Sequence, residues 1–133
     1  MIEPPEGVLE LASVVGVGID VVDVDRFRAV LARRPGFGER VFTPAERAGS
    51  SGDAAVHLAS RFAAKEAALK ALGCGIFAVA LNEIEVVGGG DAPPRLELGP
   101  EARRLAAERG VRHWLLSLSH ERHVAAAIAV ALG

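Results

Sequence analysis

This 133-residue sequence has only one cysteine and almost no net charge. The single cysteine, Cys74, excludes an internal disulfide and fits a reducing compartment. A net charge of −2 provides no overall field to attract nucleic acid or an anionic membrane, so neither is expected as a partner. No apolar run reaches the roughly 18 residues of a membrane span. The acidic start, MIEPPEGVLELASVV, also lacks the basic segment of a signal peptide. We therefore expect a cytoplasmic protein.

The length and composition are those of one folded domain. Half of the residues are hydrophobic and 24% are charged, which is enough apolar material for a real core. We expect a loose N-terminal extension at residues 1–13 and a single domain at 14–133. Strands are predicted at 14–22, 82–87, 95–98, 112–117 and 124–132, with a hairpin loop at 118–122. Helices between some of these strands, without regular alternation, indicate the α+β class.

The first predicted strand contains two glycines and one acidic residue among its valines. Gly16 and Gly18 predict that another backbone approaches the strand closely. Asp20 needs a partner if it is buried, because carboxylates are seldom buried unpaired. A metal ion or an arginine could be that partner, or Asp20 could accept backbone hydrogen bonds at the strand end. The sequence alone leaves these possibilities open.

Two helix starts are well marked. Thr43, Pro44 and Glu46 form a capping-box pattern with proline at the first helical position. Asp53 can cap a long alanine-rich helix that runs to residue 72, where Gly73 ends it.

Four charged residues lie on adjacent stripes of this long helix. Arg61 and Lys65 are four positions apart and share one face, and Glu66 and Lys70 share the neighbouring face. Such a pattern usually means a solvated helix face. Small alanines between the charges also leave room for a ligand or another chain.

Two further segments could bind an anion, although each is a weak signal. The turn Gly73-Cys74-Gly75 exposes backbone N–H groups beside Lys70. In the predicted hairpin loop, Ser119 and His120 form no recognisable hydrolase motif, but a histidine among serines can bind phosphate. The other histidines have no zinc-ligand spacing.

Taken in order, four motifs resemble those of one family, the holo-acyl-carrier-protein synthases, which are small phosphopantetheinyl transferases. The motifs are GIDVVDVDRF at 18–27, FTPAE at 42–46, RFAAKEA at 61–67 continuing to KALG at 70–73, and SLSH at 117–120. The resemblance covers nearly the whole chain from residue 14 onward. It implies a small antiparallel sheet packed on one long helix, in a protein that forms homotrimers with active sites at subunit boundaries.

The resemblance also implies site residues and a reaction. Asp20 and Glu66 correspond to ligands of Mg²⁺, which prefers oxygen ligands and few protein carboxylates. Arg26 corresponds to a residue that meets the acidic acyl carrier protein. A carrier serine attacks the β-phosphorus of coenzyme A and releases adenosine 3′,5′-bisphosphate, with Lys70 adding positive charge. The implied coenzyme A contacts are Arg61, Lys70, Gly73, Gly75 and His120.

Some choices stay open at this point. Either Glu66 or a water on the metal could accept the serine proton. The carrier could serve polyketide or peptide synthesis rather than fatty-acid synthesis, and a non-catalytic carrier-binding module is a further alternative. Two local departures from the family pattern are His123, where an aspartate is frequent, and the triple glycine at 88–90.

Overall fold

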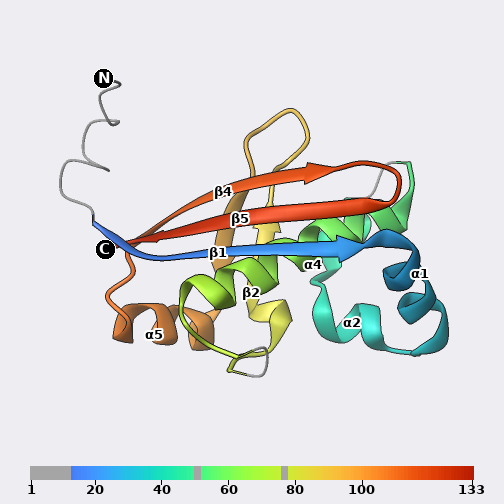
Figure 1. The fold of residues 1–133 in the computed structure, drawn as a ribbon. Coiled ribbons are helices and arrows are strands. Elements are labelled where there is room, and N and C mark those ends of the chain that lie inside the picture. Colours follow the sequence, from blue (N-terminus) through green and yellow to red (C-terminus); the bar gives the residue numbers. More distant parts are fainter. Residues whose placement is uncertain (1–12, 50–51, 76–77) are drawn as a thin grey trace, which may run out of the picture.

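The structure, a computed structural model, describes residues 13–49, 52–75 and 78–133. Most of the predicted extension at 1–13 lies outside these residues; Ser13 itself exchanges two backbone hydrogen bonds with Gly133. The elements are β1 (Val14–Asp23), α1 (Val24–Arg33), α2 (Phe37–Val41), α3 (Pro44–Ala48), α4 (Ala54–Ala71), the 3-10 helix η1 (Leu81–Glu83), β2 (Ile84–Val87), β3 (Arg95–Leu98), α5 (Pro100–Glu108), β4 (His113–His120) and β5 (Val124–Leu132) (Figure 1).

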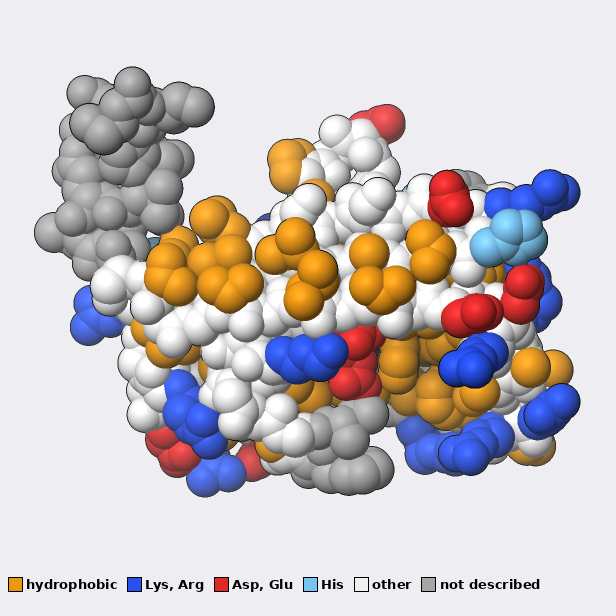
Figure 2. Space-filling model, in the orientation of Figure 1, with side chains coloured by type: hydrophobic (Ala, Val, Ile, Leu, Met, Phe, Trp, Pro, Cys, Tyr) orange, Lys and Arg blue, Asp and Glu red, His pale blue; other side chains and the backbone are white. Residues whose placement is uncertain are grey.

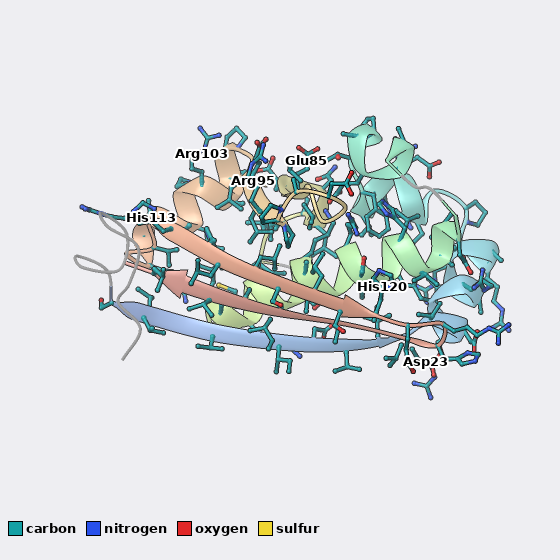
Figure 3. All side chains as sticks on the ribbon, turned by 90° about the horizontal axis from the view of Figure 1, so that it is seen from above. Asp23, Glu85, Arg95, Arg103, His113 and His120 are labelled. Atoms are coloured by element: carbon teal, nitrogen blue, oxygen red, sulfur yellow. The ribbon has the colours of Figure 1, made fainter. Side chains whose placement is uncertain are left out.

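The three longest strands form an antiparallel sheet in the order β1-β5-β4, while β2 and β3 form a separate hairpin. Helix α4 packs along β1 and β5, and the helices all lie on one side of the larger sheet (Figure 3). The α+β class and the small antiparallel sheet on one long helix are therefore confirmed.

Small residues let α4 lie unusually close to β1. A Cβ atom added to Gly18 would fall 1.9 Å from the carbonyl oxygen of Ala67, and one added to Gly16 would fall 1.9 Å from that of Ala71. The predicted close backbone approach is thus real, and α4 is the approaching element. The facing positions of β5 are buried alanines at 125, 127, 129 and 131. This tight contact fixes the distance between side chains of β1 and α4.

Aromatic side chains close the other end of the helical layer. Phe27 of α1 lies with its ring centroid 5.3 Å from that of Phe62 of α4 and 6.0 Å from that of Phe37 of α2. The rings of Phe27 and Phe37 meet edge to face and those of Phe27 and Phe62 are tilted, and aromatic pairs of this kind stabilise a core beyond the burial of its area. The short helices α1 and α2 are thereby held against the first half of α4.

Several local predictions need correction. The segment at 118–120 continues strand β4, with Leu118 opposite Ala127 and His120 opposite Ala125, so the turn is shorter than predicted. Its polar residues had indicated a loop, but Ser117 and Ser119 take alternate, exposed strand positions. The predicted strand at 82–87 begins only at 84, after the turn of η1, and α2 had not been predicted.

The outer face of the three-stranded sheet is apolar and uncovered. Ile19 is 57% exposed and Val21 is 62% exposed, and side chains of this kind form a band across the strands (Figure 2). Further exposed members are Val15, Val17, Leu115, Val124 and Ile128. Exposed patches of this kind commonly mark contact surfaces. Among the helices of the described ranges, none has the length and hydropathy to cross a membrane.

Candidate active site

Strand β1 and helix α4 bring two carboxylates together. Asp20 lies on the strand face that looks toward α4, because side chains alternate along β1 and its neighbours Ile19 and Val21 point outward. Burial raises the pKa of Glu66, and the negative charge of Asp20 raises it further. Within the described residues, Oε1 of Glu66 is buried and has no hydrogen-bond partner. Two neighbouring carboxylates of this kind are costly while both carry a charge.

Lys70 supplies a cation at one side of this pair. Its Nζ lies 3.1 Å from Oδ1 of Asp20 and 2.9 Å from the carbonyl oxygen of Ile19. The positive charge of Lys70 partly offsets the rise in the pKa of Glu66. The partner of Asp20 in this structure is therefore a lysine from α4, one turn after Glu66.

The two carboxylates line an open groove of about 530 Å³, together with the charged residues Asp23, Arg26 and Arg34. The groove walls are mostly apolar and include Phe27, Val30, Phe37 and Phe62. Arg26 stands at its edge: its backbone N–H donates to Asp23 at the start of α1, and the residue is exposed. The groove can therefore hold an uncharged chain that leads to a charged group.

Arg61 and His120 meet in a second hollow, of about 870 Å³. Arg61 is only 8% exposed, and its guanidinium donates to the carbonyl oxygen of Gly88 at 2.8 Å and to Oγ of Ser60 at 3.0 Å. His120 comes from the last position of β4, on the same side of the strand as the half-buried Leu118. The glycine-rich segment at 88–90, which accepts the hydrogen bond from Arg61, also lines this hollow. Two predicted phosphate ligands thus share one hollow, named the basic hollow after Arg61, although its lining also includes Asp53, Asp91 and Glu121.

The predicted site residues that line a hollow fall into two groups within one chain. Asp20 and Glu66 line the groove, while Arg61 and His120 line the second hollow, and none of the residues that the structure describes lines both. Gly73 ends α4 with a φ of +72° and donates its N–H to the carbonyl oxygen of Lys70. Gly73 and the exposed Gly75 line neither hollow and stand beyond Lys70 at the end of α4.

Sequence reasoning missed the buried ion pair behind the site. Lys65 is fully buried; its Nζ lies 2.7 Å from Oε1 of Glu46 and also donates to the carbonyl oxygens of Leu81 and Ile84. The solvated-face interpretation is therefore wrong for Lys65, and the buried Arg61 departs from it as well. Glu46 does close the predicted capping box with Thr43, and its other oxygen accepts from Val86 N–H.

Comparison with known proteins agrees with these motifs. Residues 16–129 match the family model of the 4′-phosphopantetheinyl transferase superfamily. The chain belongs to this superfamily. Among curated relatives, the holo-[acyl-carrier-protein] synthase of Streptomyces avermitilis is 44% identical over 125 residues, which cover 91% of this chain and 99% of the relative. The family resemblance seen in the sequence is confirmed.

Solved structures of the superfamily have the same fold. The holo-ACP-synthase from Plasmodium yoelii superposes with a TM-score of 0.80 and 30% identity, over 92% of this chain and 97% of the other. A complex of the Chronobacterium ammoniagenes protein with CoA gives a TM-score of 0.75 at 31% identity, over 87% and 95% of the two chains. The synthase fold expected from the motifs is thereby confirmed.

Proposed function

We propose that this transferase moves the 4′-phosphopantetheine group of coenzyme A onto a serine of apo-acyl carrier protein. Adenosine 3′,5′-bisphosphate is the second product. The observation that carries this proposal is the 44% identity to a holo-[acyl-carrier-protein] synthase across 99% of that relative's length. A solved relative in complex with CoA supports coenzyme A as the donor.

The donor set of the groove fits a hard divalent cation. Asp20 and Glu66 contribute only carboxylate oxygens, one of them buried without a hydrogen bond. Groups of three or more acidic, histidine or cysteine ligands do not occur in the described part of the chain. Two carboxylates suit Mg²⁺, which keeps water and substrate phosphate in its remaining positions. We infer that Asp20 and Glu66 hold Mg²⁺, which when bound neutralises charge on the pyrophosphate.

Residues of the chain then stabilise the charge that develops in the reaction and accept the serine proton. The serine oxygen forms a bond to the β-phosphorus, the bond from that phosphorus to the bridging oxygen breaks, and the electron pair leaves with adenosine 3′,5′-bisphosphate. Lys70 places positive charge beside the phosphates, where negative charge develops. The serine proton passes to Glu66 or to a water beside it.

Coenzyme A can also use both hollows if subunits associate. Its phosphates are charged and its pantetheine arm is largely uncharged, which matches the basic hollow at Arg61 and His120 and the mostly apolar groove. Because these two hollows share no residue within one chain, we propose that the groove of one subunit and the basic hollow of another form each complete site. Gly73 and Gly75 would then approach the pyrophosphate beside Lys70.

The apolar outer face of the sheet supports such an assembly. Ile19, Val21 and their exposed neighbours form a band that water would otherwise cover. We infer a homotrimer that buries this band. Arg26, exposed at the groove edge, is proposed to contact acidic residues of the carrier protein, since it lies where the pantetheine arm would leave the groove.

One assay tests the function directly. The purified chain is incubated with coenzyme A, MgCl₂ and apo-acyl carrier protein, and the carrier is weighed by mass spectrometry. The carrier is expected to gain one phosphopantetheine, with one equivalent of adenosine 3′,5′-bisphosphate released. A parallel reaction with a peptide-synthase carrier domain tests the breadth of substrate choice. No mass gain on any carrier in the presence of bound coenzyme A would favour a binding module instead.

A further inference from the structure

A histidine that the proposed reaction has not used also lines the basic hollow. His57 lies on the same stripe of α4 as Arg61, which follows four positions later and also lines the hollow. Asp53, the residue that caps α4, is a further lining residue. The imidazole is half-buried and also borders a smaller hollow of about 290 Å³ on the side of β2 and β3. His57 thus stands between two cavities, next to the proposed phosphate ligands.

The hydrogen bonding of His57 leaves it able to gain a second donor. Its Nε2 lies 3.1 Å from the backbone carbonyl oxygen of Glu46, so in the neutral ring Nε2 carries the proton and donates to that oxygen. Within the described residues, Nδ1 makes no hydrogen bond of its own. Protonation would keep the bond to Glu46 and turn Nδ1 into a donor for an anion.

The ligand-free protein favours the neutral ring. Burial lowers the pKa of His57, the positive charge of Arg61 lowers it further, and His120 adds a smaller effect. The carbonyl and carboxylate of Glu46 act in the opposite direction. The other charged groups that border the two hollows are Asp53, Glu85, Asp91, Glu97, Glu121 and Arg122.

Ion pairs with basic side chains neutralise two of the carboxylates near His57. Asp53 forms a two-point contact with Arg28, with oxygen-to-nitrogen distances of 2.8 and 3.1 Å. Glu46 is held by the buried Lys65. Arg61 is the buried cation that an entering phosphate would meet beside the two histidines, while Asp91 and Glu121 also line the hollow.

The geometry points to His57 as a third contact for a phosphate group of coenzyme A, one that takes up a proton when the anion binds. This inference rests on the proposed function, because it requires coenzyme A to place a phosphate beside Arg61 and His120. The negative charge of a bound phosphate favours the protonated form of His57, and the protonated ring can donate a charge-assisted hydrogen bond to that phosphate. Coenzyme A binding should then strengthen as the pH falls from about 8 to about 6, around the ordinary histidine pKa.

Calorimetry on the full-length protein tests this inference. Coenzyme A is titrated into wild type, His57→Gln and His113→Gln at pH 6.5, in two buffers with different ionisation enthalpies, so that the difference reports the protons taken up. Glutamine can still donate to the carbonyl oxygen of Glu46. His113→Gln is the matched control, because His113 is exposed at the opposite end of β4.

We expect His57→Gln to take up fewer protons than wild type and to bind coenzyme A about tenfold more weakly at pH 6.5, as the loss of one charge-assisted hydrogen bond predicts. The affinity gap should narrow at pH 8.5, and His113→Gln should match wild type throughout. Equal proton uptake and affinity in His57→Gln and wild type would overturn the inference.

A third variant separates this failure from failure of the proposed function. Arg61→Gln should weaken coenzyme A binding at every pH if the basic hollow holds a phosphate. If Arg61→Gln weakens binding while His57→Gln behaves as wild type, only the role of His57 is wrong. If neither variant affects binding although the wild type binds coenzyme A, the basic hollow is not its site and the role of His57 is wrong, whereas a wild type that does not bind coenzyme A would contradict the proposed function itself.

Discussion

Lys70 places its ammonium nitrogen 3.1 Å from a carboxylate oxygen of Asp20, although fifty positions separate the two residues. The contact joins the last turn of α4 to the middle of β1, and Glu66 stands one helical turn before Lys70. A lysine and a proposed magnesium ion therefore draw on the same carboxylate. Lys70 therefore has two proposed roles: it offsets the negative charge of Asp20, and it stabilises the negative charge of the phosphates.

Replacing Lys70 should separate metal binding from catalysis. Lys70→Met removes a positive charge beside Asp20, so Mg²⁺ should bind more tightly. The transfer rate at saturating Mg²⁺ should nevertheless fall about 100-fold, the typical loss for one charge-stabilising donor. Initial rates over a Mg²⁺ series measure both effects, with Arg104→Met on the exposed surface of α5 as the control. A variant with the wild-type rate would remove Lys70 from the phosphate site.

The buried Lys65–Glu46 pair should matter for folding more than for chemistry. Lys65→Met leaves the Glu46 carboxylate buried without its cation and removes the lysine donor from the carbonyl oxygens of Leu81 and Ile84. We expect the free energy of unfolding to fall by about 3–5 kcal/mol. Breaking the exposed Arg104–Glu101 pair with Arg104→Ala should change it by less than about 1 kcal/mol. Urea unfolding followed by circular dichroism compares them, and similar losses in both variants would contradict this account.

The ion pair between Arg28 and Asp53 predicts a specific acid response. Its hydrogen bond to Arg28 lowers the pKa of Asp53 from 3.8 to about 2. A depressed carboxyl pKa stabilises the fold above the unfolded-state value, and this contribution is lost as the pH falls from about 4 through about 2. Asp53→Asn keeps the helix cap but removes the charge.

The melting temperature of the wild type should therefore fall more steeply than that of Asp53→Asn over this acidic range. Asp91→Asn serves as the control, because Asp91 is an exposed residue of the loop between β2 and β3. Parallel curves for wild type and Asp53→Asn would mean that the pair does not persist in solution.

The apolar sheet face predicts how the assembly can be broken. Ile19→Lys puts a charge in the centre of the band that we propose the trimer buries. Sedimentation should show smaller species, and transfer activity should fall with the loss of complete sites. Ala107→Lys, on the exposed side of α5, should leave both unchanged. An Ile19→Lys protein that remains trimeric would place the interface elsewhere.

The local chain signals were sufficient for most of the fold. The glycines of β1, the capping box at Thr43 and the ends of α4 each depend on neighbouring residues, and these features are present as predicted. The pairing of Lys65 with Glu46 could not be predicted in this way, because burial of a helix charge depends on which distant element covers it. The long alanine stretch around Lys65 was the available signal.

The candidate site was likewise predicted only in part from the sequence. Family motifs identified Asp20 and Glu66, and the contact between β1 and α4 explains why they meet. The motifs did not predict that Arg61 and His120 line a different hollow from Asp20 and Glu66. The order of motifs along the chain does not say toward which cavity each side chain points. His57 belongs to no motif and was found only from its place on the α4 stripe.

The most direct test of the central claim is the Mg²⁺ dependence of carrier phosphopantetheinylation in Asp20→Asn and Glu66→Gln, beside wild type. Wild type should respond to Mg²⁺ with saturation and stop on addition of EDTA. Each variant should be folded and lose activity at least about 100-fold, as expected when a ligand of a catalytic metal is removed. Wild-type rates in either variant, or wild-type activity that persists in EDTA, would contradict the claim that these two carboxylates hold the catalytic metal.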